Sequence, residues 1–246
     1  MKEHVGTTDL DVVVGVTIST EEHEVYRTLQ NNLKDAGFAP ARNPETGQEL
    51  SFRWSRDVDG IEVLLKFFCP VGDGQPGTML RNPGAEVGSK ISAIRMSGAE
   101  LVALDSFTVS LSGETLDHGG IQEGIEVHIA NLLPFLVLKA FALEERAKDK
   151  DSYDIVWTLN AYPEGVEGAV QAMAQSPVFG HADVATAIGY LRKNFQSIEH
   201  RGPAQYARFE RMDDSEEERV NLRRYAYGTL TEFFRLWDAA QLPPTA

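Results

Sequence analysis

Two aspartates, Asp9 and Asp11, stand one residue apart at the start of the apolar run DLDVVVGVTI. In a β-strand such residues project from the same face, with Cα atoms roughly 7 Å apart, so their carboxylates can converge on one cation. A buried strand tolerates two charges only at an exposed end or where a metal ion compensates them. The pair therefore predicts a divalent-cation site. A solvated turn ahead of the strand would explain the same residues.

Glu62 interrupts a second apolar stretch, GIEVLLKFF, close to its start. If that stretch forms a strand beside the first, Glu62 joins Asp9 and Asp11 in a three-carboxylate cluster. Mg²⁺ (or Mn²⁺) prefers such oxygen ligands, and two ions could hold the attacking and leaving oxygens of a phosphoryl displacement. The alternative is that Glu62 faces solvent on an edge strand and pairs with Lys66 or Arg53.

A basic helix is predicted downstream from the pattern KAFALEERAKDK. Lys139 and Arg146 are seven residues apart and so lie on nearly the same helical face, where two cations could approach a triphosphate. Lys148 and Lys150 add positive charge near the end of this helix. Solvated charges on an ordinary helix face would produce the same pattern.

Asp151 and Asp154 follow directly after this basic segment. Asp151 is a good N-cap residue for a following helix, and Asp154 occupies the capping-box position three residues later. An ordinary junction between two helices would account for both.

These residues need elements to position them, and hydrophobic periodicity predicts which ones. Two strand-rich segments, 50–56 and 61–71, flank the turn sequence DVDG and should pair as an antiparallel hairpin. A helix should begin at the capping box of Ser19 and Glu22 and end at Gly37. Further strands are expected at 103–112 and 125–130, and further helices at 131–150, 151–162, 181–195 and 215–240.

The fold class that follows is α+β. A mixed sheet with flanking helices should occupy residues 1–130, and a helical region, 131–246, should pack on it. The 37 acids and 23 bases give a net charge of −14, which repels nucleic acid and anionic lipid over most of the surface. With neither a membrane-length apolar run nor a signal core, the chain should be cytoplasmic, and its single cysteine, Cys69, should lie in the core.

Taken together, TTDLDVVV, the acid in IEVLL and the segment LPFLVLKAFALEERAKDKDSYDIVWTL resemble the nucleotidyltransferase-fold proteins of the AbiEii/AbiGii toxin family. The resemblance covers roughly residues 6–160 and implies a nucleotidyltransferase-like sheet. It also implies transfer of a nucleotide from an NTP to an acceptor hydroxyl on RNA, such as tRNA, on a protein or on a small molecule. Many such proteins are toxins, so the resemblance implies an antitoxin partner as well.

The same resemblance assigns three kinds of role. The metal-binding catalytic acids would be Asp9, Asp11 and Glu62. The cations beside the nucleotide phosphates would be Lys139, Arg146 and Lys150. The residues that orient those cations would be Asp151 and Asp154.

The family pattern also has a Gly-Ser or Gly-Gly helix start about ten residues before its paired aspartates, where backbone amides hold the triphosphate. The eight residues before Asp9 contain no such pair. Either Met1 is internal to a longer chain, or nucleotide binding has been lost. The competing hypotheses are therefore a nucleotidyltransferase and a catalytically degenerate member that acts by binding. A third, a small-molecule nucleotidyltransferase of the antibiotic-modifying kind, suits the acidic surface.

Overall fold

The computed structural model describes residues 4–6, 9–14, 23–80, 91–111, 124–146, 148–210 and 215–241. The chain forms two compact units. The sheet unit comprises Val5–Glu100 and Thr108–Ile129, and the helical unit comprises Met1–His4, Leu101–Phe107 and Ala130–Ala246. The predicted boundary after residue 130 is one residue from the observed one, because the chain leaves the sheet unit for the last time after Ile129. His4 and the segment 101–107 join the helical unit, which the sequence did not indicate.

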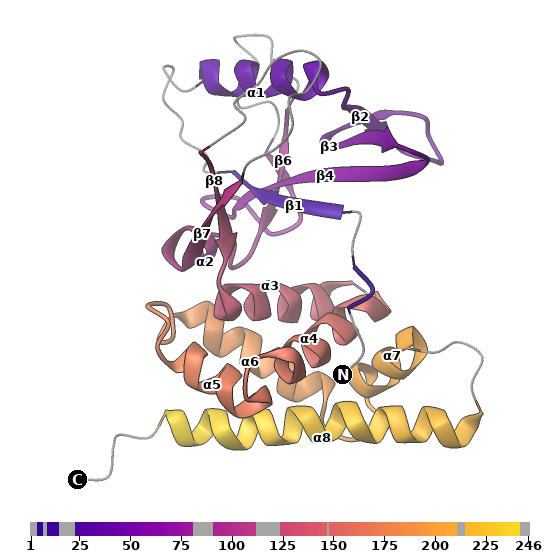
Figure 1. Cartoon of the computed structure of the whole chain (residues 1–246), viewed down its shortest axis with the longest axis vertical. Helices are drawn as coiled ribbons and strands as arrows, with labels where there is room; N and C mark the ends of the chain where they lie inside the picture. The colour runs from indigo at the N-terminus through magenta and orange to yellow at the C-terminus, as the bar shows by residue number, and fades with distance from the viewer. Residues whose placement is uncertain are drawn as a thin grey trace. The chain divides into compact units, whose positions relative to one another are not determined.

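The predicted α+β class is confirmed, with the main sheet in the first half of the chain and helices in the second (Figure 1). The main sheet has the strand order β2-β3-β4-β6-β5, and β1 also pairs with β4. Its strands are β1 (Asp9–Val13), β2 (Ala39–Arg42), β3 (Glu49–Val58), β4 (Ile61–Pro70), β5 (Met79–Leu80) and β6 (Ala93–Met96). β4, which carries Glu62, therefore lies beside β1, which carries Asp9 and Asp11.

The predicted hairpin is present as β3 and β4, which pair antiparallel from Arg53 opposite Lys66 to Val58 opposite Ile61. Asp59 and Gly60 close its turn with φ angles of 53° and 81°. Two consecutive positive φ values are typical of the type I′ turns that match strand twist, and Asp-Gly adopts them readily.

Helix α1 (His23–Asp35) packs on the main sheet through Leu33, which meets Trp54, Phe67 and Cys69 in one buried cluster. The predicted helix end is confirmed at Gly37, whose φ of 80° glycine can adopt without steric strain. The predicted cap residues Ser19 and Glu22 lie outside the described residues. Cys69 is a core residue, as predicted, and burial raises the pKa of its thiol.

A short helix and a second sheet connect the two units along the chain. Helix α2 (Glu100–Leu104) precedes β7 (Ser106–Leu111), which pairs with β8 (Ile125–Ala130) in a two-stranded sheet. Asp105 is buried and accepts hydrogen bonds from the side chains of Asn131 at 2.9 Å and Ser176 at 2.5 Å. These bonds tie the segment 101–107 to the helices of its own unit.

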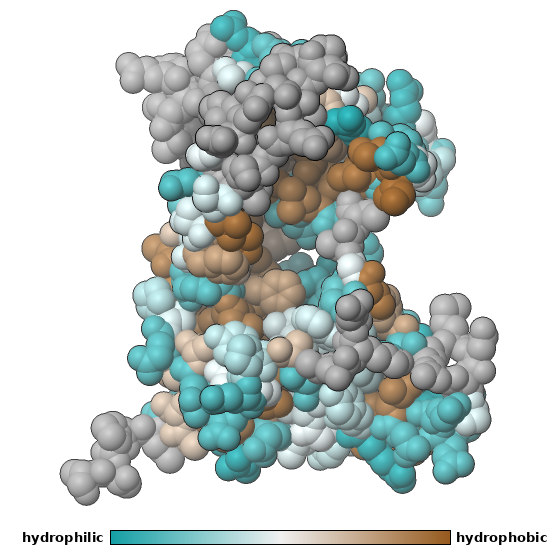
Figure 2. Space-filling model, viewed as in Figure 1, coloured by the Kyte–Doolittle hydropathy of each residue, from teal (hydrophilic) through white to brown (hydrophobic). Residues whose placement is uncertain are grey.

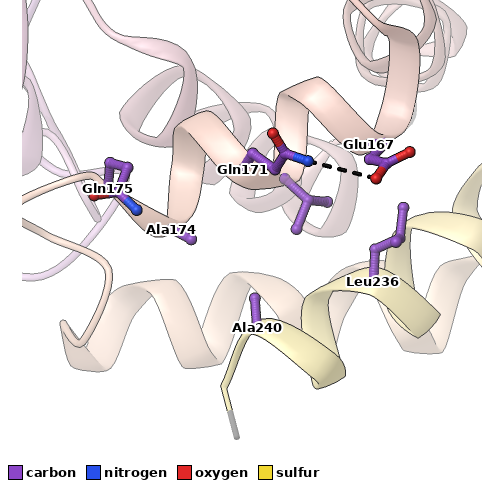
Figure 3. A pocket seen from close by; sticks show the side chains of 7 residues that line it. Glu167, Gln171, Ala174, Gln175, Leu236 and Ala240 are labelled. Carbon is purple, nitrogen blue, oxygen red and sulfur yellow. Dashed lines mark hydrogen bonds between the residues drawn. The ribbon is translucent and has the colours of Figure 1, made fainter. Parts of the chain in front are cut away.

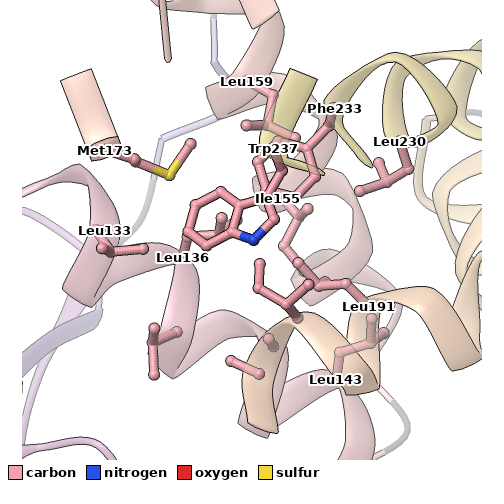
Figure 4. Packing of buried hydrophobic residues seen from close by; sticks show 14 of the residues in the cluster. Leu133, Leu136, Leu143, Ile155, Leu159, Met173, Leu191, Leu230, Phe233 and Trp237 are labelled. Carbon is pink, nitrogen blue, oxygen red and sulfur yellow. The ribbon is translucent and has the colours of Figure 1, made fainter. Parts of the chain in front are cut away.

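The helical unit packs around one apolar core that includes Leu136, Leu159 and Trp237 (Figure 4). Its larger helices are α3 (Leu132–Glu145), α4 (Asp149–Ala161), α5 (Gly165–Ala174), α6 (Ala182–Asn194), α7 (Arg201–Glu210) and α8 (Glu216–Ala240). Hydrophilic side chains cover much of this unit in the view of Figure 2, with hydrophobic ones scattered among them. In the described part of the chain, no helix has the length and apolar character needed to cross a membrane.

Two of these helices, α5 and α7, were not predicted from the sequence. Gly165 and Gly168 weaken the helical signal in α5, and the Gly202-Pro203 pair does so in α7. Gly168 is required by packing, because a Cβ there would stand 2.0 Å from the carbonyl oxygen of Pro163. The local cost of these residues is offset by burial of the helices against the core.

Candidate functional site

The aspartate pair lies on β1, which runs parallel to β4 with Asp9 opposite Leu64 and Asp11 opposite Lys66. Paired residues in a sheet project from the same face, so both aspartates share a face with Lys66. Its ammonium forms an ion pair with Asp9 and lies 3.7 Å from Asp11 Oδ1. The two carboxylates therefore reach one common cation, which is a lysine of the same sheet.

The lysine side chain is less exposed to solvent than the two aspartate side chains. The side chain of Lys66 is 16% exposed, whereas those of Asp9 and Asp11 are 36% and 51% exposed. The ammonium thus lies under two carboxylates that face solvent. A surface of this kind presents oxygen ligands outward, which is the chemistry that a hard cation requires.

Glu62 lies on the same face of the main sheet, two residues before the partner of Asp9, and is exposed. Within the described residues, no group of three or more acids, histidines or cysteines is arranged to hold a metal ion. Asp9 and Asp11 instead share the ammonium of Lys66 as their common cation. The role of Glu62 as a third ligand stays a prediction, and Lys66 contacts the two aspartates rather than Glu62.

The second predicted group lies where α3 gives way to α4. The helix predicted over 131–150 ends at Glu145, because Arg146 adopts an extended conformation with φ −131° and ψ 150°. Helix α4 begins at Asp149, two residues earlier than predicted, and its N-cap residue, Lys148, makes no side-chain cap. The predicted capping roles of Asp151 and Asp154 are therefore wrong, and both carboxylates are buried inside α4.

The two buried carboxylates bind the three predicted cations. Arg146 donates two hydrogen bonds to Asp151, from Nε to Oδ2 and from Nη2 to Oδ1, both at 2.8 Å. Lys139 Nζ lies 2.5 Å from Asp154 Oδ2 and 3.6 Å from Asp151 Oδ1. Lys150 Nζ donates to both oxygens of Asp154, at 2.9 and 3.2 Å. We call these five residues the α3–α4 polar cluster.

His4 is a further member of this environment that sequence reasoning missed. Its Nε2 lies 3.1 Å from Asp154 Oδ1, and its ring packs edge-on against Trp157 with centroids 4.7 Å apart. His4 and Asp154 are 150 positions apart in the chain, so no local spacing could have indicated their contact.

The electrostatics of the cluster favour the ionised form of Asp154. Burial opposes ionisation of Asp154, but the charges and hydrogen bonds of Lys139 and Lys150 outweigh it and hold the pKa of this carboxyl below its usual value. The side chains of Asp151 and Asp154 are only 2% and 4% exposed. Those of Lys139, Lys150 and Arg146 are 21%, 33% and 41% exposed. The cluster thus holds three cations on two carboxylates, and the exposed Glu145 carboxylate also interacts with Arg146.

A separate hollow lies between α5 and α8, with a volume of about 480 Å³ (Figure 3). Its polar side chains include Glu167 and Gln171, which hydrogen-bond to each other at 3.4 Å. None of its lining residues is a cation. This hollow therefore has no positively charged side chain that would attract a phosphate.

No protein-family model, curated protein or solved structure matches this chain. The interpretation of the site therefore depends on the geometry of its own residues.

Proposed function

We propose that this protein is a metal-dependent nucleotidyltransferase that transfers a nucleotide from an NTP to an acceptor hydroxyl. The observation that carries the proposal is the α3–α4 polar cluster, in which buried Asp151 and Asp154 hold three cations at the surface. Cations whose geometry is set by buried carboxylates are already ordered when a ligand arrives, so binding a polyphosphate costs less conformational entropy.

The cations differ in what they can offer a phosphate. Arg146 keeps its planar guanidinium in place through two bonds to Asp151, and such a group suits phosphate oxygens as well as carboxylates. Lys150 contributes a compact charge on a flexible stem. Together with Lys139, these groups would bind the β- and γ-phosphates as the pyrophosphate leaves.

The proposed reaction is an in-line displacement at the α-phosphorus of the NTP. The acceptor oxygen forms a bond to phosphorus, the bond from phosphorus to the bridging oxygen of the pyrophosphate breaks, and the acceptor proton passes to solvent. Asp9 and Asp11 would hold Mg²⁺ or Mn²⁺, with Glu62 as the predicted third acid. When bound, the ion supplies stabilisation of the negative charge that develops on the phosphate oxygens.

Label transfer from a radiolabelled NTP tests the activity. The wild-type protein, incubated with Mg²⁺ and candidate RNA, protein and small-molecule acceptors, should move label to one of them, and Asp11→Asn should abolish the transfer. Asp35→Asn, which neutralises an exposed acid at the end of α1, is the matched control and should retain it. Unchanged transfer by Asp11→Asn would exclude the proposed metal site.

Nucleotide binding can be tested independently of transfer. Lys150→Gln should weaken NTP binding about tenfold, because a charge-assisted hydrogen bond to phosphate is lost. Lys148→Gln removes an exposed charge two residues away that lies outside the polar cluster, and it should leave the affinity nearly unchanged. Calorimetric titration with NTP compares the two variants, and equal losses would contradict a specific phosphate site.

The acceptor is better matched by a small molecule than by tRNA, since the net charge of −14 opposes association with a polyanion. If RNA is the acceptor, its binding should weaken steeply as salt rises. An antitoxin partner remains part of the proposal and would be sought by co-expression with the neighbouring open reading frame.

A second candidate function is nucleotide binding without transfer. The contact of Lys66 with Asp9 and Asp11 favours this alternative, because the carboxylates already have a counter-ion. The two candidates differ in one pair of measurements. An NTP that raises the melting temperature while no label moves to any acceptor would identify a binding protein.

A further inference from the structure

His4 contacts the α3–α4 polar cluster, although it lies outside both helices. Its Nε2 is 3.1 Å from Asp154 Oδ1, and its side chain is 28% exposed. The same carboxylate oxygen accepts a hydrogen bond from Lys150 Nζ at 2.9 Å. The other oxygen, Oδ2, accepts bonds from Lys139 at 2.5 Å and from Lys150 at 3.2 Å. His4 and Lys150 therefore share one oxygen of a buried acid.

The charge of Asp154 determines how His4 makes this contact. Burial opposes ionisation of the carboxyl, but the charges and hydrogen bonds of Lys139 and Lys150 outweigh it and hold its pKa below the usual value. The carboxylate is therefore ionised at neutral pH and can only accept hydrogen bonds. It follows that Nε2 of His4 carries a hydrogen and donates it, and a bond to a charged acceptor is stronger than a neutral one.

The imidazole ring of His4 is held by two aromatic residues of α4, the helix that carries Asp154. The ring meets Trp157 edge-on, with centroids 4.7 Å apart and an interplanar angle of 69°. It packs against Tyr153 with centroids 5.3 Å apart, and Tyr153 is fully buried in the core of the helical unit. These contacts set the direction in which His4 offers its hydrogen.

We propose that His4 is a positioning residue of the α3–α4 polar cluster, whose hydrogen bond fixes the rotation of the Asp154 carboxylate and thereby the place of Lys150. The terminal torsion of an aspartate has broad energy wells, so the surrounding donors decide where its two oxygens point. Lys150 bonds to both oxygens and follows that rotation. The consequence for ligands rests on the proposed function, because an ordered ammonium binds phosphate at a lower entropic cost.

Two substitutions separate the hydrogen bond of His4 from the packing of its ring. His4→Phe keeps a ring against Trp157 but removes the donor, whereas His4→Gln keeps an N–H donor without the ring. Nitrogen-15 NMR spectra of the lysine ammonium groups, recorded at low temperature, measure how fast each exchanges its protons with water. In His4→Phe, Lys150 should exchange at least about threefold faster than in wild type, and His4→Gln should restore most of the protection. Lys193, which pairs with Glu144, is the internal control and should exchange alike in all three proteins.

Binding of inorganic tripolyphosphate measures the consequence for the proposed phosphate site. In calorimetric titrations, His4→Phe should bind tripolyphosphate about fivefold more weakly than wild type, and His4→Gln should lose less than about twofold. Rescue by His4→Gln distinguishes the hydrogen bond from a general loss of packing at this position.

The outcomes distinguish this inference from the proposed function. Equal exchange rates at Lys150 in wild type and His4→Phe would overturn the positioning role. Equal changes in His4→Phe and His4→Gln would assign the effect to ring packing and would overturn it as well. If the exchange rates differ as expected but wild type binds no tripolyphosphate, His4 still positions Lys150, and the proposed phosphate site is overturned instead.

Discussion

The two charged groups of this protein differ in which charge is buried and which is exposed. In the sheet unit, the cation Lys66 is 16% exposed beneath Asp9 and Asp11, which are 36% and 51% exposed. In the helical unit, Asp151 and Asp154 are almost fully buried beneath cations that reach 41% exposure at Arg146. One group therefore presents anions to solvent, and the other presents cations.

This inversion is relevant to the ligands proposed for the two groups. Buried charges keep their counter-ions because separation inside the protein is costly, whereas exposed charges can exchange partners with solvent ions. Carboxylates at the surface can take up a metal ion, and ordered cations at the surface can take up a phosphate.

The largest expected effect comes from neutralising a buried aspartate of the α3–α4 polar cluster. Asp154→Asn removes the charge that Lys139 and Lys150 share, and it should lower the free energy of unfolding by about 3 kcal/mol. That loss corresponds to a fall in melting temperature of roughly 10 °C for a domain of this size. Thermal unfolding followed by circular dichroism measures it.

The matched control is Asp238→Asn, which breaks the surface pair between Arg192 and Asp238. Their side chains are 42% and 60% exposed, so the loss should stay below about 1 kcal/mol. Similar losses for Asp154→Asn and Asp238→Asn would show that burial of the carboxylate does not distinguish them.

An intermediate effect is expected from pH. The pKa of Asp154 is lower in the folded protein than its ordinary value of about 3.9, so its contribution to stability is complete above that value and is lost as pH falls through the folded pKa. The stability gap between wild type and Asp154→Asn at pH 7 should therefore shrink below about pH 4. Urea unfolding midpoints at pH 7, 4 and 3 measure this gap, and a constant gap would contradict the assignment.

The smallest effect is expected in the sheet unit. Asp11→Asn should change the free energy of unfolding by less than about 0.5 kcal/mol, because the Asp11 carboxylate is half exposed and lies 3.7 Å from its partner. Differential scanning calorimetry would measure the change. A loss as large as that of Asp154→Asn would remove the contrast between the two groups.

Much of the fold could be predicted because the relevant signals are local. Asp59 and Gly60 form the turn that their residue types favour, and Gly37 ends α1 with a positive φ. Ser215 caps α8 through a complete capping box with Glu218. Helices α5 and α7 were missed because their stability comes from burial against the core, which periodicity weakened by glycine and proline does not reveal.

The candidate site was predictable only in part for the same reason. The paired aspartates and the spaced cations are sequence patterns, and they identified the residues that the structure brings into two groups. The capping role assigned to Asp151 was a local interpretation, and it was wrong because α4 begins at Asp149 and the Asp151 carboxylate is bound by Arg146. His4 and Lys66 join their groups through contacts between distant segments, which leave no local signal.

By itself, the sequence determined the α+β class, the elements with strong local signals and the residue types available for metal and phosphate chemistry. Only the tertiary structure decided which charges are buried, because burial depends on strand register and helix packing between segments far apart in the chain. Register placed Lys66 beside the two aspartates, and packing of α3 against α4 brought Lys139 to Asp154, whereas Lys150 contacts Asp154 within α4. The sign of the charge that each group presents to solvent follows from these placements.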